Sequence, residues 1–398
     1  MSNKEVLLRV EHLCQYFKLG RGFVNKAVDD VSFDVYKGEV FGLVGESGCG
    51  KTTTGRSIIK LYDITSGNVF FKGQRICAGT QSYKDNIQSA KEEMKTADAA
   101  KKAELRKFIA EQKKEIKLAK FDQKKSDKMY AKRLVSELTA EYDAKIAAAS
   151  GEEAQKLRAE YREKRHVALR TRLITQIQMI FQDPIASLDP RMTVKDIISE
   201  GLIIQGVRDK EYIMNRVYEM LETVGLVREH AGRYPHEFSG GQRQRIGVAR
   251  SIVMEPSLII ADEPISALDV SIRAQVINLL NDLRHELGIT ILFIAHDLSV
   301  VKYFSDRIGV MYCGKLVELA ESDELFKHPL HPYTRSLLSA IPLPDPEYER
   351  NRKRITYNPI ADHDYRFDKP SLKEVAPGHF VLCDNAELEK YRKEIAED

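Results

Sequence analysis

The chain has few of the features that mark secreted, membrane-spanning or metal-clustered proteins. Among its 398 residues there is no apolar run near the ~20 residues that a membrane span needs. The first residues, Met1 to Glu5, show no secretory segment. The five cysteines are scattered and lack the paired spacing of a zinc site: Cys14, Cys49, Cys77, Cys313 and Cys383. These absences predict a reduced, cytosolic protein.

A strong excess of one charge is also missing. The formal net charge is +3, which gives no overall sign of nucleic-acid binding. Hydrophobic residues make up 43% of the chain, enough for a sizeable core, and the length suggests about two or three domains.

The order of apolar runs predicts an α/β fold. Short strands are expected at residues 7–10, 31–35 and 69–71, and again at 177–181, 257–261 and 289–294. Amphipathic helices are expected at 194–202, 211–224 and 271–287, and a closing hairpin at 307–312 and 315–319. Strands that alternate with helices favour a mainly parallel sheet.

Residues 82–170 differ in character from the segments on either side. They contain no proline and one glycine, Gly151, and are rich in Lys, Glu and Ala, which favour helix. Residues 121–126 are the weakest helical part and predict a turn, and Ser150 with Glu153 fits a capping box. We therefore expect an inserted antiparallel helical hairpin, with arms of ~55 Å at 1.5 Å per residue. It should project into solvent and pack mostly on itself.

A phosphate-binding loop is the strongest motif. Residues 45–52 fit G-x-x-x-x-G-K-[ST], with a buried strand before them and a helix after them. Such glycines let backbone N–H groups surround phosphate oxygens at a helix N-terminus. Lys51 can reach the β- and γ-phosphates, and the Thr52 hydroxyl can ligate Mg²⁺. The nucleotide-binding candidates are Gly45, Glu46, Ser47, Gly48, Cys49, Gly50, Lys51, Thr52 and Thr53.

Two acids end the apolar strand at 258–261. Asp262 is placed to hold Mg²⁺, directly or through water. Glu263 follows it and is the candidate general base for a water that attacks the γ-phosphate.

A second anion-binding helix start follows Phe238. Ser239 is a natural N-cap, and Gly240, Gly241 and Gln242 leave backbone N–H groups exposed. Because one nucleotide does not need two such sites from one chain, we expect a head-to-tail pair in which this loop closes over the partner's γ-phosphate. Asp269 lies where the two subunits would meet.

Three single residues complete the candidate site. Gln182 ends one expected strand and can touch Mg²⁺ and the attacking water. His296 ends another and can hydrogen-bond the γ-phosphate. Phe17, near a glycine-rich loop, is the candidate for stacking on adenine.

The order of these motifs resembles that of the ATP-binding subunits of ABC transporters. Residues 177–184 (IQMIFQDP), 233–238 (RYPHEF) and 331–334 (HPYT) are similar to the oligopeptide/dipeptide importer ATPases. The resemblance covers roughly residues 5–80 and 172–350. It implies a P-loop ATPase with an antiparallel β subdomain and a helical subdomain that carries the Ser-Gly-Gly-Gln loop.

The resemblance also implies cofactors and partners. The cofactors are ATP and Mg²⁺, and the dimer would hydrolyse two ATP at its interface, the second ATPase subunit being by family precedent a paralogue. The dimer would drive two membrane permease subunits, supplied with peptide by an extracytoplasmic binding protein. No nucleic acid is expected, and the chain would sit peripherally on the cytoplasmic face of the membrane.

Two departures from the family pattern affect these expectations. The family usually lacks a long helical stretch at 82–170, and it often carries several C-terminal cysteines for an iron–sulfur cluster, which we do not expect here. The expected organisation is an ATPase domain over 1–330, interrupted by 82–170, and an extension over 331–398 with a short helix and a loosely ordered tail. The alternative function is a soluble ABC ATPase that acts on ribosomes or nucleic acid through the insertion. A third possibility makes the insertion a docking surface on an ordinary importer subunit.

Overall fold

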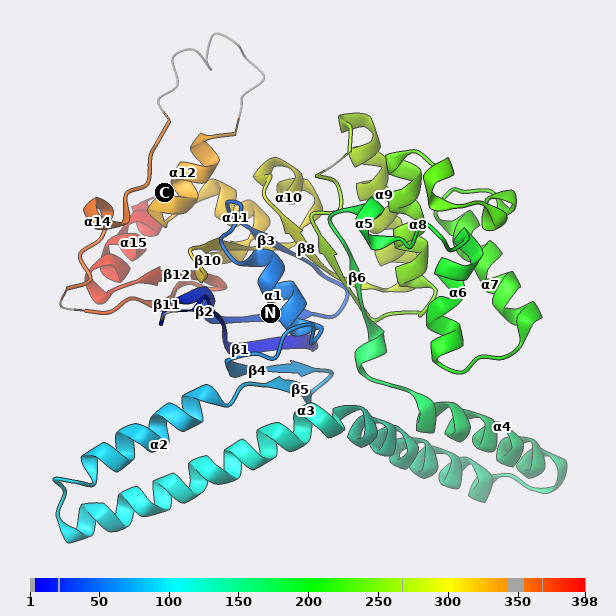
Figure 1. Cartoon of the computed structure of the whole chain (residues 1–398), viewed down its shortest axis with the longest axis horizontal. Helices are drawn as coiled ribbons and strands as arrows, with labels where there is room; N and C mark the ends of the chain where they lie inside the picture. The colour runs from blue at the N-terminus through cyan, green and yellow to red at the C-terminus, as the bar shows by residue number, and fades with distance from the viewer. Residues whose placement is uncertain (1–3, 21, 267, 342–353, 367, 398) are drawn as a thin grey trace.

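The computed structural model describes residues 4–20, 22–266, 268–341, 354–366 and 368–397. It contains two sheets (Figure 1). The antiparallel sheet has four strands in the order β2-β1-β4-β5, and the second sheet has eight in the order β11-β12-β10-β9-β3-β8-β7-β6. The run β9-β3-β8-β7-β6 is parallel throughout. The predicted α/β architecture is therefore confirmed.

The strands are β1 (Val6–Lys18), β2 (Val24–Tyr36), β3 (Val40–Val44), β4 (Ser66–Phe71), β5 (Gln74–Ala78), β6 (Ile177–Ile180), β7 (Leu258–Asp262), β8 (Thr290–Ala295), β9 (Arg307–Tyr312), β10 (Lys315–Glu321), β11 (Ser371–Ala376) and β12 (His379–Cys383). The helices are α1 (Lys51–Ile58), α2 (Gln81–Glu93), α3 (Ala99–Ala148), α4 (Gly151–Arg170), α5 (Pro184–Ser187), α6 (Val194–Ile204), α7 (Lys210–Thr223), α8 (Gly240–Ile252), α9 (Val270–Leu287), α10 (Leu298–Phe304), α11 (Ser322–Lys327), α12 (Pro332–Ser339), α14 (Pro359–Asp362) and α15 (Asn385–Glu397). None of these helices is long and apolar enough to cross a membrane.

The core lies on both faces of the eight-stranded sheet. Successive side chains of a strand point to opposite faces, so Leu258 and Ile260 pack toward α1 and the four-stranded sheet. Ile259 and Ala261 pack on the other face, against the helices of the right-hand lobe in Figure 1. The central strands are apolar on both faces because both faces are covered.

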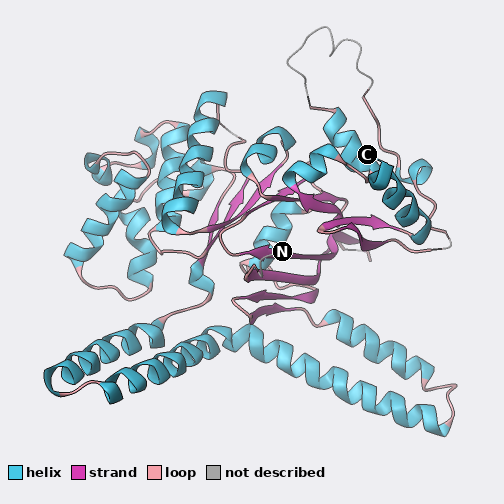
Figure 2. Cartoon of the chain, turned by 180° about the vertical axis from the view of Figure 1, so that it is seen from behind, coloured by secondary structure: helices cyan, strands magenta, loops and turns pink. Residues whose placement is uncertain are grey.

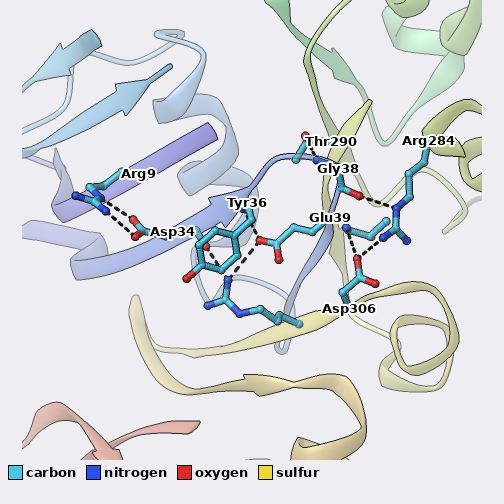
Figure 3. A network of polar contacts seen from close by, with 10 residues as sticks. Arg9, Asp34, Tyr36, Gly38, Glu39, Arg284, Thr290 and Asp306 are labelled. Carbon is cyan, nitrogen blue, oxygen red and sulfur yellow. Dashed lines mark hydrogen bonds and ion pairs between the residues drawn. The ribbon is translucent and has the colours of Figure 1, made fainter. Parts of the chain in front are cut away.

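A network of polar contacts joins the two sheets where β2 leads into β3 (Figure 3). Arg9 forms two hydrogen bonds with Asp34, at 2.9 and 3.0 Å. Arg307 Nη1 donates to the Asp34 carbonyl at 3.1 Å and to Glu39 Oε1 at 3.3 Å. The Tyr36 N–H donates to the same Glu39 oxygen at 2.7 Å. These contacts fix the sheets to each other around the start of β3, the strand that leads to the phosphate loop.

The insertion differs from the predicted single hairpin. The expected turn at 121–126 is wrong, because these residues lie inside α3, which runs unbroken for 50 residues. The first part of α3 packs against α2 and the last part against α4, so two hairpins extend in different directions (Figures 1 and 2).

The middle of α3 packs on the core formed by the two sheets instead of projecting into solvent. Tyr130 is 5% exposed and belongs to the core between the two sheets. Arg75 of β5 pairs with Asp122 at 2.7 Å. Lys60, just after α1, donates to Ser126 Oγ at 3.1 Å. Asp127 accepts a hydrogen bond from the Ile174 N–H at 3.2 Å.

The C-terminal extension is also more ordered than expected in its described part. β12 pairs with β10, and β11 pairs with β12, so the extension continues the main sheet. Tyr391 of α15 and Val381 are buried in a small core of their own. The expectation of a loosely ordered tail is wrong for residues 371–397, and residues 342–353 lie outside the described part.

Candidate functional site

The predicted phosphate loop connects β3 to α1 and is closely packed. Gly45 has φ 151°, and a Cβ there would lie 2.2 Å from the Met311 carbonyl oxygen. Gly50 has φ 107°, and a Cβ there would lie 2.2 Å from the Ala27 carbonyl oxygen. Only glycine fits such positions. The glycines therefore let β2 and β9 hold the loop from outside.

Lys51 closes the loop on itself. Its Nζ donates to the carbonyl oxygens of Gly45, at 2.7 Å, and of Glu46, at 2.9 Å, and the residue is buried. The ammonium group is thus held at the loop, where a phosphate would lie.

A cavity of about 530 Å³ lies over this loop. Its lining includes Phe17 of β1, and Gln182 and Glu263 beyond the ends of β6 and β7. From the loop it includes Ser47, Gly48, Gly50, Lys51, Thr52 and Thr53. The structure therefore brings the expected adenine, phosphate and water-activating residues to one cavity. Gly45, Glu46 and Cys49 belong to the loop but do not line the cavity, and Cys49 is buried.

Thr52 and Asp262 lie in contact beside this cavity. The Thr52 hydroxyl donates to Asp262 Oδ1 at 2.7 Å, whereas the buried Asp262 Oδ2 has no hydrogen-bond partner among the described residues. Arg56 Nη2 lies 3.9 Å from that oxygen. Burial raises the pKa of Asp262, and the Thr52 hydroxyl and the Arg56 charge only partly oppose this shift. A buried carboxylate oxygen without a partner is what a hard cation requires.

Glu263 is the point at which two other candidates meet. Its Oε2 accepts a hydrogen bond from Gln182 Nε2 at 3.0 Å and lies 3.1 Å from His296 Nδ1. Glu263 has φ 45°, unusual for a residue other than glycine, and its N–H donates to the Ile294 carbonyl at 2.9 Å. Such backbone strain is typical of functional positions. Three separate strands thus hold one carboxylate at the cavity.

The Ser-Gly-Gly-Gln loop stands apart from the cavity. Ser239 caps α8 with a capping box, in which its Oγ accepts from the Gln242 N–H at 3.4 Å. A Cβ at Gly241 would lie 2.7 Å from Ile272 of α9. Neither residues 239–242 nor Asp269, the N-cap residue of α9, line the cavity. The neighbouring Ala267 lies outside the described residues.

Sequence reasoning missed a second group of residues at the site. Asn25, Lys26 and Ala27 of β2 and Cys313 with Gly314, in the β9–β10 turn, also line the cavity. Tyr333 of α12 touches the loop from behind, since its hydroxyl accepts from the Glu46 N–H at 3.1 Å. The HPYT tetrapeptide was the only sign of Tyr333, and nothing in the sequence linked it to the loop.

Comparisons with known families agree with this geometry. A family described as "ABC transporter" matches residues 28–158 and 150–266. A second, "Oligopeptide/dipeptide transporter, C-terminal region", matches residues 317–365, which include Tyr333.

Similar proteins match along almost their whole length. The oligopeptide transport ATP-binding protein OppF of Bacillus subtilis (strain 168) is 50% identical over 388 residues, covering 97% of this chain and 99% of that protein. The dipeptide transport ATP-binding protein DppF of Lactococcus lactis subsp. cremoris (strain MG1363) is 42% identical over 396 residues, 99% of each chain. Among solved structures, the dimeric post-hydrolysis state of the ATP-binding cassette MJ0796 with ADP and Pi shares the fold. Its TM-score is 0.51 at 22% identity, covering 79% of this chain and 99% of that one. The chain therefore belongs to the ABC transporter ATP-binding proteins of the oligopeptide/dipeptide importer family.

Proposed function

We propose that the chain hydrolyses ATP to power the uptake of oligopeptides or dipeptides through separate membrane permease subunits. One observation carries the catalytic part of this proposal. The Glu263 carboxylate is held by Gln182 and His296 in the same cavity as Lys51. The names of the relatives support the transport part, because they are oligopeptide and dipeptide transport proteins.

In this proposal each residue has a defined task toward ATP. Phe17 stacks on the adenine, and Lys51 exchanges its loop carbonyls for the β- and γ-phosphate oxygens. Glu263 accepts a proton from the attacking water as the bond to the γ-phosphorus forms and the bond to the bridging oxygen of ADP breaks. Gln182 orients that water, and His296 donates a hydrogen bond to the γ-phosphate.

The donor set also fits Mg²⁺. Thr52 Oγ1, the Gln182 amide oxygen and Asp262 Oδ2, which lacks a hydrogen-bond partner among the described residues, are hard oxygen ligands of the kind that Mg²⁺ prefers. When bound, Mg²⁺ neutralises charge on the phosphates and the leaving group. The hydrogen bond from the Thr52 hydroxyl to Asp262 Oδ1 holds both side chains in place until then.

The separate Ser-Gly-Gly-Gln loop favours a head-to-tail dimer. Ser239 and the exposed N-terminus of α8 would bind the γ-phosphate held by the partner subunit, with Asp269 at the interface. The partner is a second ABC ATPase, by family precedent a paralogue, and the pair would sit peripherally at the cytoplasmic face of the membrane. An extracytoplasmic binding protein would deliver the peptide.

The alternative of a ribosome- or nucleic-acid-acting ATPase has no support among the matched families. The test of the proposal is ATP hydrolysis by the purified subunit with its partner. Glu263→Gln should keep ATP binding but lower turnover by about 10² or more. Hydrolysis at the normal rate in that variant would refute the catalytic assignment.

A further inference from the structure

The outer face of the middle of α3 forms a straight basic stripe. One side of this helix packs under β5, and no element covers the other side among the described residues (Figures 1 and 2). At 100° per residue around the helix axis, six exposed side chains each point within ~40° of the mean direction of the group. They are Lys114, Lys117, Phe121, Lys125, Lys128 and Lys132. The stripe spans ~27 Å at 1.5 Å per residue.

Acidic side chains are turned away from this stripe. Between Glu111 and Glu137 the acids are Glu115, Asp122 and Asp127, and none is fully exposed. Asp122 is paired with Arg75 and Asp127 with the Ile174 N–H, so both are used in docking the helix. Among the described residues, the outer surface of this part of α3 therefore carries positive charge only.

The lysines of the stripe do not stabilise the protein through polar contacts. Within the part of the chain that the structure describes, none of the five makes a side-chain hydrogen bond or an ion pair, although lysines elsewhere on the insertion, such as Lys145 and Lys164, do. The fold thus leaves these five charges available for an external anion.

Large apolar side chains stand exposed among the lysines. Phe121 is 50% exposed, Leu118 40% and Met129 36%. Lysines clustered on a helix are attracted to anionic lipid, and exposed apolar side chains beside them can enter the boundary between headgroups and acyl chains. A nucleic-acid surface would favour arginine for bidentate phosphate contacts, and the stripe has none.

We propose that this stripe docks on anionic lipid headgroups, with Phe121 inserted between them. The inference rests on the proposed function for the presence of a membrane beside the protein. It leaves the nucleotide site free, because α3 contacts the chain at Ile174, just before β6, whereas Gln182 lies beyond the other end of that strand. Lipid contact would thus hold the subunit at the membrane independently of ATP.

The test uses the full chain without permease, in sedimentation with vesicles of phosphatidylcholine containing 30% phosphatidylglycerol, or of phosphatidylcholine alone. The stripe variant is Lys117→Gln/Lys125→Gln/Lys128→Gln. The control is Lys91→Gln/Lys95→Gln/Lys156→Gln, which changes net charge equally at exposed hairpin positions. We expect binding to anionic vesicles only. Each lysine near an anionic surface raises the affinity for that surface about fivefold. The stripe variant should therefore bind anionic vesicles more than tenfold more weakly than the wild type, and the control variant should lose much less affinity.

Two further readouts separate the outcomes. High salt should weaken binding, and Phe121→Ser should weaken it at constant charge. The proposal is overturned if the wild-type chain ignores anionic vesicles, or if both triple variants lose binding equally. It is also overturned if the stripe variant binds anionic vesicles as well as the wild-type chain does, but loses binding to an RNA or to permease in neutral vesicles in a separate assay. ATP hydrolysis, measured on the same preparations, reports separately on the proposed function and should be unchanged in both triple variants.

Discussion

Replacing Tyr130 by alanine tests whether the insertion is part of the ATPase fold. Tyr130 is 5% exposed and packs in the core between the two sheets, and Gln176 Nε2 donates to its hydroxyl at 3.4 Å. Truncating a buried aromatic side chain costs about 3–5 kcal/mol, because the contacts are lost and a cavity remains. At about 1.2 °C for each kcal/mol in a chain of this size, the melting temperature should fall by about 4–6 °C.

Tyr142 is the matched control. It is 1% exposed, but it packs in the hairpin formed by α3 and α4, against Tyr161 of α4, with ring centroids 5.7 Å apart. Tyr142→Ala should loosen that hairpin locally, which hydrogen exchange would detect, and leave the melting temperature of the ATPase nearly unchanged. If thermal unfolding responds equally to both variants, or not to Tyr130→Ala, then α3 is not docked as described.

Three further predictions concern the site. Ser239→Ala should leave ATP affinity of the isolated subunit unchanged but abolish ATP-dependent dimerisation, measured by light scattering; weaker binding by the monomer would contradict the head-to-tail arrangement. Tyr333→Phe removes the hydroxyl that accepts from the Glu46 N–H, a hydrogen bond worth about 1 kcal/mol, so calorimetry should show ATP binding roughly 2–10-fold weaker. The control is Tyr357→Phe, which keeps the ring contact between residues 333 and 357. An equal loss of ATP affinity in that control would refute the role of the Tyr333 hydroxyl. Asp262→Asn removes a carboxylate whose pKa burial raises above its ordinary 3.8. A raised pKa means that ionisation of this carboxyl destabilises the fold. In Mg²⁺-free buffer the variant should therefore be more stable than the wild type at pH 7, by a margin that shrinks toward pH 4. With Mg²⁺ present, the variant should lose ATP hydrolysis. A margin that grows as the pH falls would show that the carboxylate is stabilised.

The sequence predicted the parallel core and the phosphate loop because both are local signals. Strands covered on both faces, such as β7 and β8, are continuous apolar runs, and the loop is one contiguous motif at a strand-to-helix junction. The meeting of Gln182, Glu263 and His296 followed from the same topology, since the carboxyl ends of neighbouring parallel strands lie at one edge of the sheet.

The remaining features depend on contacts that no local pattern reveals. Asp122 and Ser126 are poor helix formers and predicted a turn, but Arg75 and Lys60 satisfy them from the core, so the helix continues. Tyr333 reaches the phosphate loop because α12 of the C-terminal extension packs on the main core. Distant pairing of this kind overrides propensity and leaves no spacing in the sequence.

The most direct test of the account is peptide uptake by proteoliposomes that contain the permease subunits, this chain and its partner ATPase, with the binding protein outside and ATP inside. A labelled oligopeptide should accumulate with the wild-type chain and Mg-ATP. With Glu263→Gln it should not, although ATP still binds. Equal uptake with that variant, or ATP hydrolysis that never moves any peptide, would contradict the claim that this chain powers peptide import.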